Sequence, residues 1–498
     1  MTLSFKYQLI IAFIAGLILP LAFAPFSYYF IAIFSPAILF YFVHKNKNLD
    51  AFKIGYGYGL GMFGFGVYWL HISINLFGGV NFFMAIIATY LLVAFMALYI
   101  GLFAWLATKV QYTSKSIYFV IVLPAIWVLI EWLRGWFLTG FPWLNLGASQ
   151  TDTILAGMAP LVGVYGVSLV VSILAGVLCI LCMEKGKSRL MTFIFSLIIT
   201  TLSWQFKNTD WTIDKNETLD IAMVQGAIPQ EQKWLPNMRI PTFERYLAMS
   251  KDHWQKDILI WPETAVPSFY HQAGKFLDTV RELALYNETT FLTGIPVYDE
   301  DKRQYFNSIV MLNRPDSFYH KKHLVPFGEY FPRITHPLMN LLGIPISNFS
   351  PAEDNQYMLE TDKAVLGLSI CYEDAYGSIV RKALPKADVL FNVSNDAWFG
   401  DSIAAHQHLQ IARMRAIENG RYLVRATNTG VSAIINEKGK ITLRSPQHEP
   451  DTLTGEIKLF SGSTMFSRYG NSLIIISCLV LLLFCYVTNK YRPERNIT

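Results

Sequence analysis

Residues 365–374 read Val-Leu-Gly-Leu-Ser-Ile-Cys-Tyr-Glu-Asp, an apolar run that ends at Cys371 and passes directly into acidic residues. The other four of the five cysteines lie inside long apolar runs: Cys179, Cys182, Cys478 and Cys485. The large polar segment around Cys371 therefore has no intramolecular disulfide to form. A single thiol at the end of a strand-like run is a candidate nucleophile. The alternative is a buried core cysteine, because free cysteine packs as a small hydrophobic residue.

The composition divides the chain into a membrane part and a globular part. The 498 residues are 53% hydrophobic and 15% charged, and the mean hydropathy of +0.33 is too high for a purely soluble protein. We predict a helical transmembrane domain at 1–204 and an extracytoplasmic catalytic domain at 205–466. A C-terminal membrane helix with a short tail follows at 467–498.

The apolar stretches predict about eight membrane spans, because a helix needs about 20 apolar residues to cross the bilayer. The expected spans are 7–24, 27–43, 54–76, 82–108, 117–138, 154–183, 190–204 and 472–489. Lys and Arg follow the second, fourth, sixth and eighth spans, whereas the loops after the first and third carry neither. Because basic loops stay in the cytoplasm, we expect both termini there. The large domain then faces the opposite side, which in a bacterium is the periplasm.

The charge pattern argues against nucleic-acid and metal chemistry. The net charge of +5 comes largely from those loops, and no basic run with interleaved aromatic residues appears. His406 and His408 are two residues apart and do not share a helix face, and no Cys/His cluster has zinc-type spacing. We interpret these histidines as polar residues of a loop or helix start, and we expect neither a metal nor a cofactor.

The polar segment alternates short apolar runs with helical stretches, which predicts a layered α/β domain. The expected strands are 219–224, 258–261, 291–295, 308–312, 365–370, 389–393, 422–426, 431–435 and 453–459. The expected helices are 241–255, 273–287 and 403–419.

Polar residues follow three of these strands: Glu263 after 258–261, Cys371 after 365–370, and Ser394 with Asn395 after 389–393. Three such strands side by side would bring an acid, a thiol and amide groups together at one sheet edge. A thiol is mostly protonated at neutral pH, so it needs a base or a nearby cation. Glu263 is a candidate base, or else a solvated strand-end carboxylate.

The run 319–329, Tyr-His-Lys-Lys-His-Leu-Val-Pro-Phe-Gly-Glu, contains the candidate cation. Its two lysines are adjacent to an apolar turn with Pro326 and Gly328, which makes partial burial plausible. The alternative is ordinary surface charge.

Read together, Trp261-Pro262-Glu263, the run 321–329 and Cys371-Tyr372-Glu373 resemble the nitrilase superfamily, whose Glu-Lys-Cys triad occurs in this chain order. The runs 323–329, 394–400, 407–409 and 428–430, with the membrane spans, resemble the membrane-embedded apolipoprotein N-acyltransferase family. This resemblance covers essentially the whole chain. It implies an α-β-β-α sandwich for the catalytic domain.

The resemblance implies that Glu263 is the general base, Lys321 the essential lysine and Cys371 the nucleophile. It assigns Lys321 rather than Lys322 because one residue separates the family lysine from the His-Leu pair. The expected supporting or substrate-binding residues are Trp234, Asn307, Glu329, Tyr372, Glu373 and Asn395. Ala227 and Ala405 depart from the pattern, where Asn and Pro are expected, and put only loop detail in doubt.

The implied reaction moves an acyl chain from the sn-1 position of a membrane phospholipid to the N-terminal diacylglyceryl-cysteine amine of apolipoproteins, through a Cys371 thioester. The expected location is the bacterial inner membrane, and nothing in the sequence demands more than a monomer. The apolar residues of 327–349 suggest a membrane-dipping arm beside Lys321, with core packing as the alternative. Two other functions stay open: a membrane-tethered amidase or nitrilase with the same triad, and a non-enzymatic scaffold or transporter. The last would need buried charges in its spans, and only Glu131 and Arg134 stand out.

Overall fold

The computed structural model describes residues 3–110, 114–330, 349–353 and 355–490. The chain divides into two compact units. The first contains Met1–His71, Ile86–Thr209 and Tyr469–Thr498, and the second contains Ile72–Ala85 and Asp210–Arg468.

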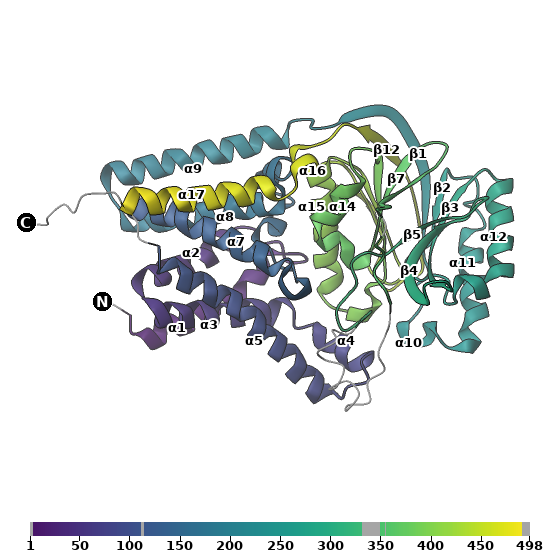
Figure 1. Cartoon of the computed structure of the whole chain (residues 1–498), viewed down its shortest axis with the longest axis horizontal. Coiled ribbons are helices and arrows are strands. Elements are labelled where there is room, and N and C mark those ends of the chain that lie inside the picture. Colours follow the sequence, from purple (N-terminus) through teal and green to yellow (C-terminus); the bar gives the residue numbers. More distant parts are fainter. Residues whose placement is uncertain (1–2, 111–113, 331–348, 354, 491–498) are drawn as a thin grey trace, which may run out of the picture. The chain divides into compact units, whose positions relative to one another are not determined.

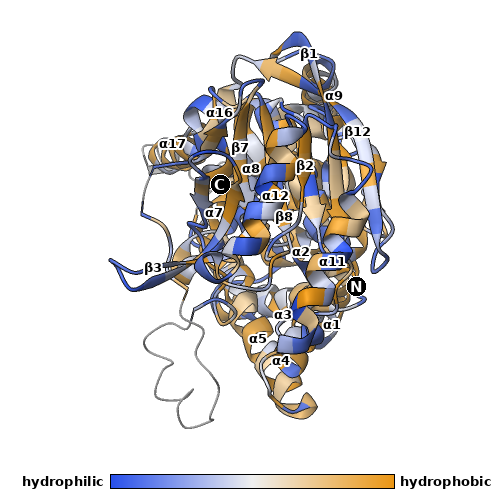
Figure 2. Cartoon of the chain, turned by 90° about the vertical axis from the view of Figure 1, so that its right-hand side faces the viewer, coloured by the Kyte–Doolittle hydropathy of each residue, from blue (hydrophilic) through white to orange (hydrophobic). Residues whose placement is uncertain are grey.

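The first unit is entirely helical in its described part. Its longer helices are α1 (Phe5–Ile18), α2 (Ile31–Lys45), α3 (Asn48–Gly66), α5 (Phe82–Ala107), α7 (Leu123–Arg134), α8 (Ala159–Met183), α9 (Gly186–Lys207) and α17 (Ser472–Lys490). Figure 2 shows the hydrophobic colouring of α5.

Fewer helices meet the length and apolarity needed for a membrane span than the eight we predicted. Among the described residues, five stretches do: Phe5–Ala22, Phe82–Ala107, Lys115–Arg134, Ile154–Met183 and Gly186–Lys207. Two further apolar helices are shorter, Ile31–Lys45 and Ser472–Thr488. The predicted span 54–76 is interrupted, because α3 ends at Gly66 and a separate short helix, α4, covers Leu70–Leu76. The predicted class, a multi-pass helical part joined to an α/β part, is confirmed, but the count of eight is too high.

Glycines explain why α3 is less apolar than its neighbours. A Cβ atom on Gly61 would lie 2.2 Å from the carbonyl oxygen of Phe13 in α1. On another face, a Cβ on Gly59 would lie 2.8 Å from the Cα of Ala97 in α5. Small residues let the backbones of membrane helices approach closely, so α3 is packed between α1 and α5.

Two charged residues of α7 are buried but hydrogen-bonded. Glu131 accepts hydrogen bonds from the Trp127 indole and the Leu146 amide, each at 2.9 Å. Arg134 donates to the Asn145 side chain at 2.6 Å. These charges therefore fix the loop that follows α7.

The second unit contains two six-stranded sheets within its described residues. The strand order is β12-β1-β2-β3-β4-β5 in the first sheet and β11-β10-β9-β8-β7-β6 in the second. The first-sheet strands are β1 (Ile213–Gln225), β2 (Ile258–Ile260), β3 (Thr290–Asp299), β4 (Gln304–Met311), β5 (Ser317–His320) and β12 (Asp451–Ser461). The second-sheet strands are β6 (Met358–Glu360), β7 (Val365–Ile370), β8 (Val389–Ser394), β9 (Leu423–Thr427), β10 (Ala433–Ile435) and β11 (Ile441–Arg444).

Every predicted strand is present, and the three predicted helices are α11 (Arg239–Ser250), α12 (Gly274–Tyr286) and α15 (Ala404–Asn419). The short strands β5, β6 and β11 were not predicted. The apolar runs of 4–8 residues were informative because both faces of the central strands are buried, as in β8.

Three apolar layers hold the second unit together. Residues such as Ile221, Ile370 and Val424 form the core between the two sheets. Helices α11 and α12 cover the other face of the first sheet through Phe243 and Leu277, and α15 with the short α14 (Gly377–Val380) covers the second sheet. Figure 1 shows this order of layers. The predicted α-β-β-α sandwich is therefore confirmed.

The predicted side-by-side arrangement of three strand ends is wrong. β7 and β8 are parallel neighbours in the second sheet, but β2 pairs with β1 and β3 in the first. Apolar runs identify buried strands but do not specify which sheet each strand joins. The acid and the thiol thus come from facing sheets rather than from one edge.

The segment Ile72–Ala85 packs with the second unit, although helical residues of the first unit flank it in sequence. The Phe77 ring lies 4.9 Å from the Trp398 ring in an edge-to-face contact. The predicted arm at 327–349 falls mainly on residues 331–348, which lie outside the described part of the chain.

Candidate active site

Cys371 lies where β7 passes into a 3-10 turn, Cys371–Ala375. Its φ angle is +52°, a left-handed conformation that is rare for residues other than glycine. The side chain is 8% exposed. Burial raises the pKa of the Cys371 thiol, Glu263 raises it further, and Lys321 acts in the opposite direction. The thiol is therefore protonated at neutral pH and needs a proton acceptor before it can react.

Glu263 follows β2, and its side chain is buried. Its charge acts on the Cys371 thiol. Its Oε1 accepts a hydrogen bond from Asn307 Nδ2 at 2.7 Å and lies 3.6 Å from Lys321 Nζ. Gly294 of β3 makes room for this turn, because a Cβ there would lie 2.6 Å from the Glu263 Cα. The carboxylate is thus held by one amide and one cation.

Lys321 follows β5 and its side chain is 1% exposed. Its Nζ donates to Glu329 Oε1 at 2.9 Å. Burial disfavours the ammonium, but Glu329 and Glu263 outweigh burial and raise the pKa of Lys321. The group is therefore a permanent cation between two carboxylates. Lys322 points elsewhere, with its Nζ 4.9 Å from the centre of the Tyr357 ring.

Asn307 links the two carboxylates around this lysine. Its Nδ2 donates to Glu263 at 2.7 Å and to Glu329 at 2.8 Å, and its backbone oxygen accepts from the Lys321 amide. Glu329 Oε2 also accepts from the Val325 amide at 2.8 Å. The predicted supporting pair Asn307 and Glu329 thus fixes both the side chain and the backbone of Lys321.

Glu373 joins the lysine loop to the cysteine turn. Its Oε1 accepts from the backbone amides of Lys322 and His323 at 2.6 and 3.1 Å. Its Oε2 accepts from the Ile370 amide and the Tyr319 hydroxyl, each at 2.7 Å. The side chain is completely buried, and its hydrogen bonds hold the two segments in place relative to each other.

The remaining predicted residues lie around this centre. Tyr372 is 8% exposed, and its ring packs against Tyr376 with centroids 5.2 Å apart. Asn395 donates to Gln230 at 2.7 Å and ties the loop after β1 to the second sheet. Trp234 is 50% exposed at the end of the short helix α10 (Gln230–Lys233). The structure thus joins Asn307 and Glu329 directly to Glu263 and Lys321, and Glu373 links the Lys321 loop to the Cys371 turn. Tyr372 and Asn395 lie on the turns that follow β7 and β8, and Trp234 follows α10.

Sequence reasoning missed Lys233, whose side chain is 1% exposed. Its Nζ donates to the backbone oxygen of Glu263 at 3.1 Å. Burial lowers the pKa of Lys233 to about 8, with Glu263 acting in the opposite direction. Nothing in the local sequence distinguishes this lysine from the exposed ones nearby.

Sequence reasoning also gave no role to Arg425 and Asp374, which are buried together with His408. Arg425 stands in the middle of an apolar strand, and a charge in a buried strand is the signal that identifies it. The predicted role of His408 as a helix-start polar residue is incomplete, because the ring lies between two buried carboxylates.

Known proteins match both units of the chain. Residues 15–177 match the model of the apolipoprotein N-acyltransferase N-terminal domain, and residues 220–463 match the carbon-nitrogen hydrolase model. An apolipoprotein N-acyltransferase of Methylococcus capsulatus is 39% identical over 97% of this chain and 96% of its own length. Similar proteins of Vibrio cholerae (92% of each chain) and Coxiella burnetii (96% of this chain, 99% of its own) are each 37% identical. The chain therefore belongs to the apolipoprotein N-acyltransferase family, the acyltransferases built on a carbon-nitrogen hydrolase domain.

Proposed function

We propose that this protein transfers an acyl chain from the sn-1 position of a membrane phospholipid to the α-amine of the diacylglyceryl-cysteine that begins an apolipoprotein. The observation that carries the proposal is the buried grouping of Glu263, Lys321 and Cys371, in which Lys321 Nζ lies 3.6 Å from Glu263 Oε1 and both charges act on the thiol. Glu263 is the proposed general base, Lys321 the oxyanion-stabilising cation and Cys371 the nucleophile.

In the first half-reaction, Glu263 accepts the Cys371 proton as the thiolate attacks the sn-1 ester carbonyl. The negative charge that forms on the carbonyl oxygen is stabilised by Lys321 and a backbone N–H. The C–O bond then breaks, and the departing lysophospholipid oxygen takes the proton from Glu263. A thioester on Cys371 remains.

In the second half-reaction, the α-amine of the acceptor attacks the thioester carbonyl and gives its proton to Glu263. The C–S bond breaks, and Glu263 returns the proton to the Cys371 sulfur. The product carries an N-acyl amide, and the enzyme is restored. The thioester suits this ping-pong scheme because it keeps the acyl group reactive while the two lipids exchange.

The buried thiol supports general-base activation rather than a preformed thiolate. A cysteine–imidazolium pair would require a lowered thiol pKa, whereas burial and Glu263 raise the pKa of Cys371. Lys321, with its ammonium between Glu263 and Glu329, is suited to stabilise charge on the substrate.

Intact mass spectrometry tests the proposal. The purified protein is incubated with phosphatidylethanolamine beside a Cys371→Ala control. One added acyl group that is absent from the control and discharged by a diacylglyceryl peptide is the expected result. Absence of an adduct, with ammonia released from amides, would instead assign the protein to the amidase or nitrilase class.

We further propose that the protein resides in the bacterial inner membrane with the catalytic unit in the periplasm and both termini in the cytoplasm. The alternation of basic loops supports this orientation. An impermeant thiol reagent added to spheroplasts should label a cysteine at exposed position 302 (Lys302→Cys) and spare one at exposed position 47 (Lys47→Cys). The reverse labelling pattern would invert the orientation.

A further inference from the structure

Four charged side chains lie together behind the Cys371 turn. Asp374 comes from that turn, Asp396 follows β8, His408 belongs to α15, and Arg425 belongs to β9. None is more than 2% exposed. We call these four residues the charge cluster.

Every member of the charge cluster forms a hydrogen bond or an ion pair with another member. Arg425 pairs with Asp374 at 2.8 Å and with Asp396 at 3.0 Å. The His408 ring lies between the same carboxylates, with Nε2 2.8 Å from Asp374 and Nδ1 2.8 Å from Asp396. Gly430 leaves space for this packing, since a Cβ there would lie 2.3 Å from Asp396 Oδ2.

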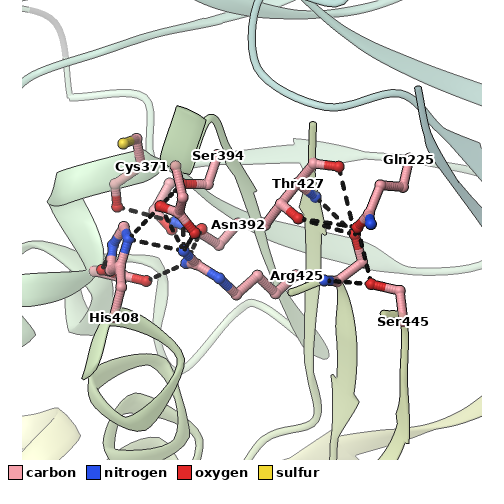
Figure 3. A network of polar contacts seen from close by, with 12 residues as sticks. Gln225, Cys371, Asn392, Ser394, His408, Arg425, Thr427 and Ser445 are labelled. Atoms are coloured by element: carbon pink, nitrogen blue, oxygen red, sulfur yellow. Dashed lines mark hydrogen bonds and ion pairs between the residues drawn. The ribbon is translucent and has the colours of Figure 1, made fainter. Parts of the chain in front are cut away.

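Asn392 connects the charge cluster to the nucleophile's backbone. Arg425 Nη1 donates to Asn392 Oδ1 at 2.7 Å, and Asn392 Nδ2 donates to the Cys371 carbonyl oxygen at 3.3 Å. Figure 3 shows the Cys371 sulfur pointing away from the network while its carbonyl oxygen faces Asn392. A left-handed φ at a non-glycine residue persists only where surrounding contacts fix it, and these contacts fix Cys371.

The charges in this group balance when His408 is protonated. Burial and Arg425 disfavour the imidazolium, but Asp374 and Asp396 outweigh them and raise the pKa of His408 to about 9. Two carboxylates then face two cations, and the sum is zero. Asp396 itself raises the pKa of Cys371, so the charge cluster influences the ionisation of the thiol.

We propose that the charge cluster positions Cys371: it holds the cysteine backbone in its left-handed conformation and, through the charge on His408, sets the pH range in which the thiol reacts. The proposal rests on the nucleophile role proposed above for Cys371. The groups that face His408 and the thiol are Asp374, Asp396 and Arg425 on one side and Glu263 and Lys321 on the other. Loss of the His408 charge leaves a net negative charge behind the sulfur, which disfavours the thiolate.

The test follows alkylation of Cys371 by iodoacetamide in the full-length protein in detergent, read on the Cys371 peptide by mass spectrometry from pH 6 to 10. At pH 7, where His408 carries its charge, His408→Gln should slow alkylation about 3- to 10-fold, an ordinary size for loss of one nearby buried charge, and this difference should shrink above pH 9. His406→Gln, the same substitution two residues earlier on α15, is the matched control and should leave the rate at pH 7 unchanged.

A charge-compensating variant separates electrostatic positioning from simple packing. His408→Gln with Asp396→Asn restores a net charge of zero, so the alkylation rate at pH 7 should return toward that of the unmodified protein. Packing damage alone would make the double variant worse than the single one. An unchanged rate at pH 7 in His408→Gln, or a double variant slower than the single one, would overturn the proposal.

If His408→Gln does not fold, the unmodified protein decides. Its alkylation rate should rise about tenfold per pH unit well below pH 9, and less steeply near pH 9, where His408 loses its charge. A uniform tenfold rise through pH 9 would overturn the proposal. Alkylation does not depend on lipid, so failure of the acyl-transfer assay together with the expected alkylation rates would reject the proposed function alone.

Discussion

Replacing Glu373 with Gln should loosen the link between the lysine loop and the cysteine turn. The carboxylate accepts four hydrogen bonds, two on each oxygen. The glutamine amide group would turn its NH2 toward Tyr319, whose hydroxyl can rotate and accept. The Ile370 amide would then face the new NH2 group, which is a donor, and would lose its hydrogen bond to this side chain.

The expected loss of stability follows from these contacts. An unsatisfied buried N–H costs about 1–3 kcal/mol, and the remaining bonds lose the extra strength of bonds to a charged acceptor. The sum is about 2–5 kcal/mol, which corresponds to roughly 30- to 5,000-fold in the local opening equilibrium.

Hydrogen–deuterium exchange read by mass spectrometry measures this effect directly. The amides of 319–325 and 366–372 should exchange about 30-fold faster or more in Glu373→Gln than in the unmodified protein. Glu360→Gln, which changes an exposed carboxylate on β6, is the matched control and should leave these peptides unchanged. Unaltered exchange in a Glu373→Gln protein would refute the claim that this carboxylate registers the two segments.

Three further substitutions test separate features of the catalytic unit. Gly294→Ala places a Cβ 2.6 Å from the Glu263 Cα and should reduce acyl transfer by about 10- to 100-fold by displacing the proposed base. Gly274→Ala, whose new Cβ would have no atom within 4 Å, is the control and should be neutral. Equal activity of the two variants would contradict the argument. Ala227 has φ +49°, a conformation that asparagine tolerates, so Ala227→Asn should stabilise the protein by about 0.5–1 kcal/mol. Ala227→Val should lower the melting temperature. A similar fall for Ala227→Asn would contradict the claim that the backbone is strained here. Burial lowers the folded-state pKa of Lys233 to about 8, so between about pH 8 and 10.5 the unfolded chain binds more protons than the folded one. This lysine therefore makes the free energy of unfolding rise with pH across that window. Denaturant unfolding of Lys233→Met should lack that rise, and the same dependence of stability on pH in both proteins would exclude a burial penalty.

The strands were predictable because buried strands appear as short apolar runs. Cys371 and Glu263 follow two of these runs, but the choice of Glu263 and Lys321 over ordinary surface charges came from the family resemblance. The pairing of β2 within the first sheet had no such signal, because strand partners depend on contacts distant in sequence. The count of spans failed for two reasons. The apolar helices Ile31–Lys45 and Ser472–Thr488 are too short, and α3 carries glycines that serve close helix packing and lower its apolarity.

The charge cluster shows a different limit. Asp374, His408 and Arg425 are spread over about 50 residues of sequence, and each alone resembles a surface charge. Only the arginine inside the apolar run 422–426 marks burial. The departure at Ala227 was visible in the sequence, but its left-handed backbone was not.

The division of the site between two sheets has a consequence for how the enzyme is made. The proposed proton acceptor and the cation belong to the first sheet, and the thiol belongs to the second. A newly synthesised chain in which only one sheet has formed carries Cys371 without its proposed base, and such a thiol is slow to attack esters. With these proposed roles, reactivity begins only when the sandwich closes, so unfinished molecules are protected from premature self-acylation.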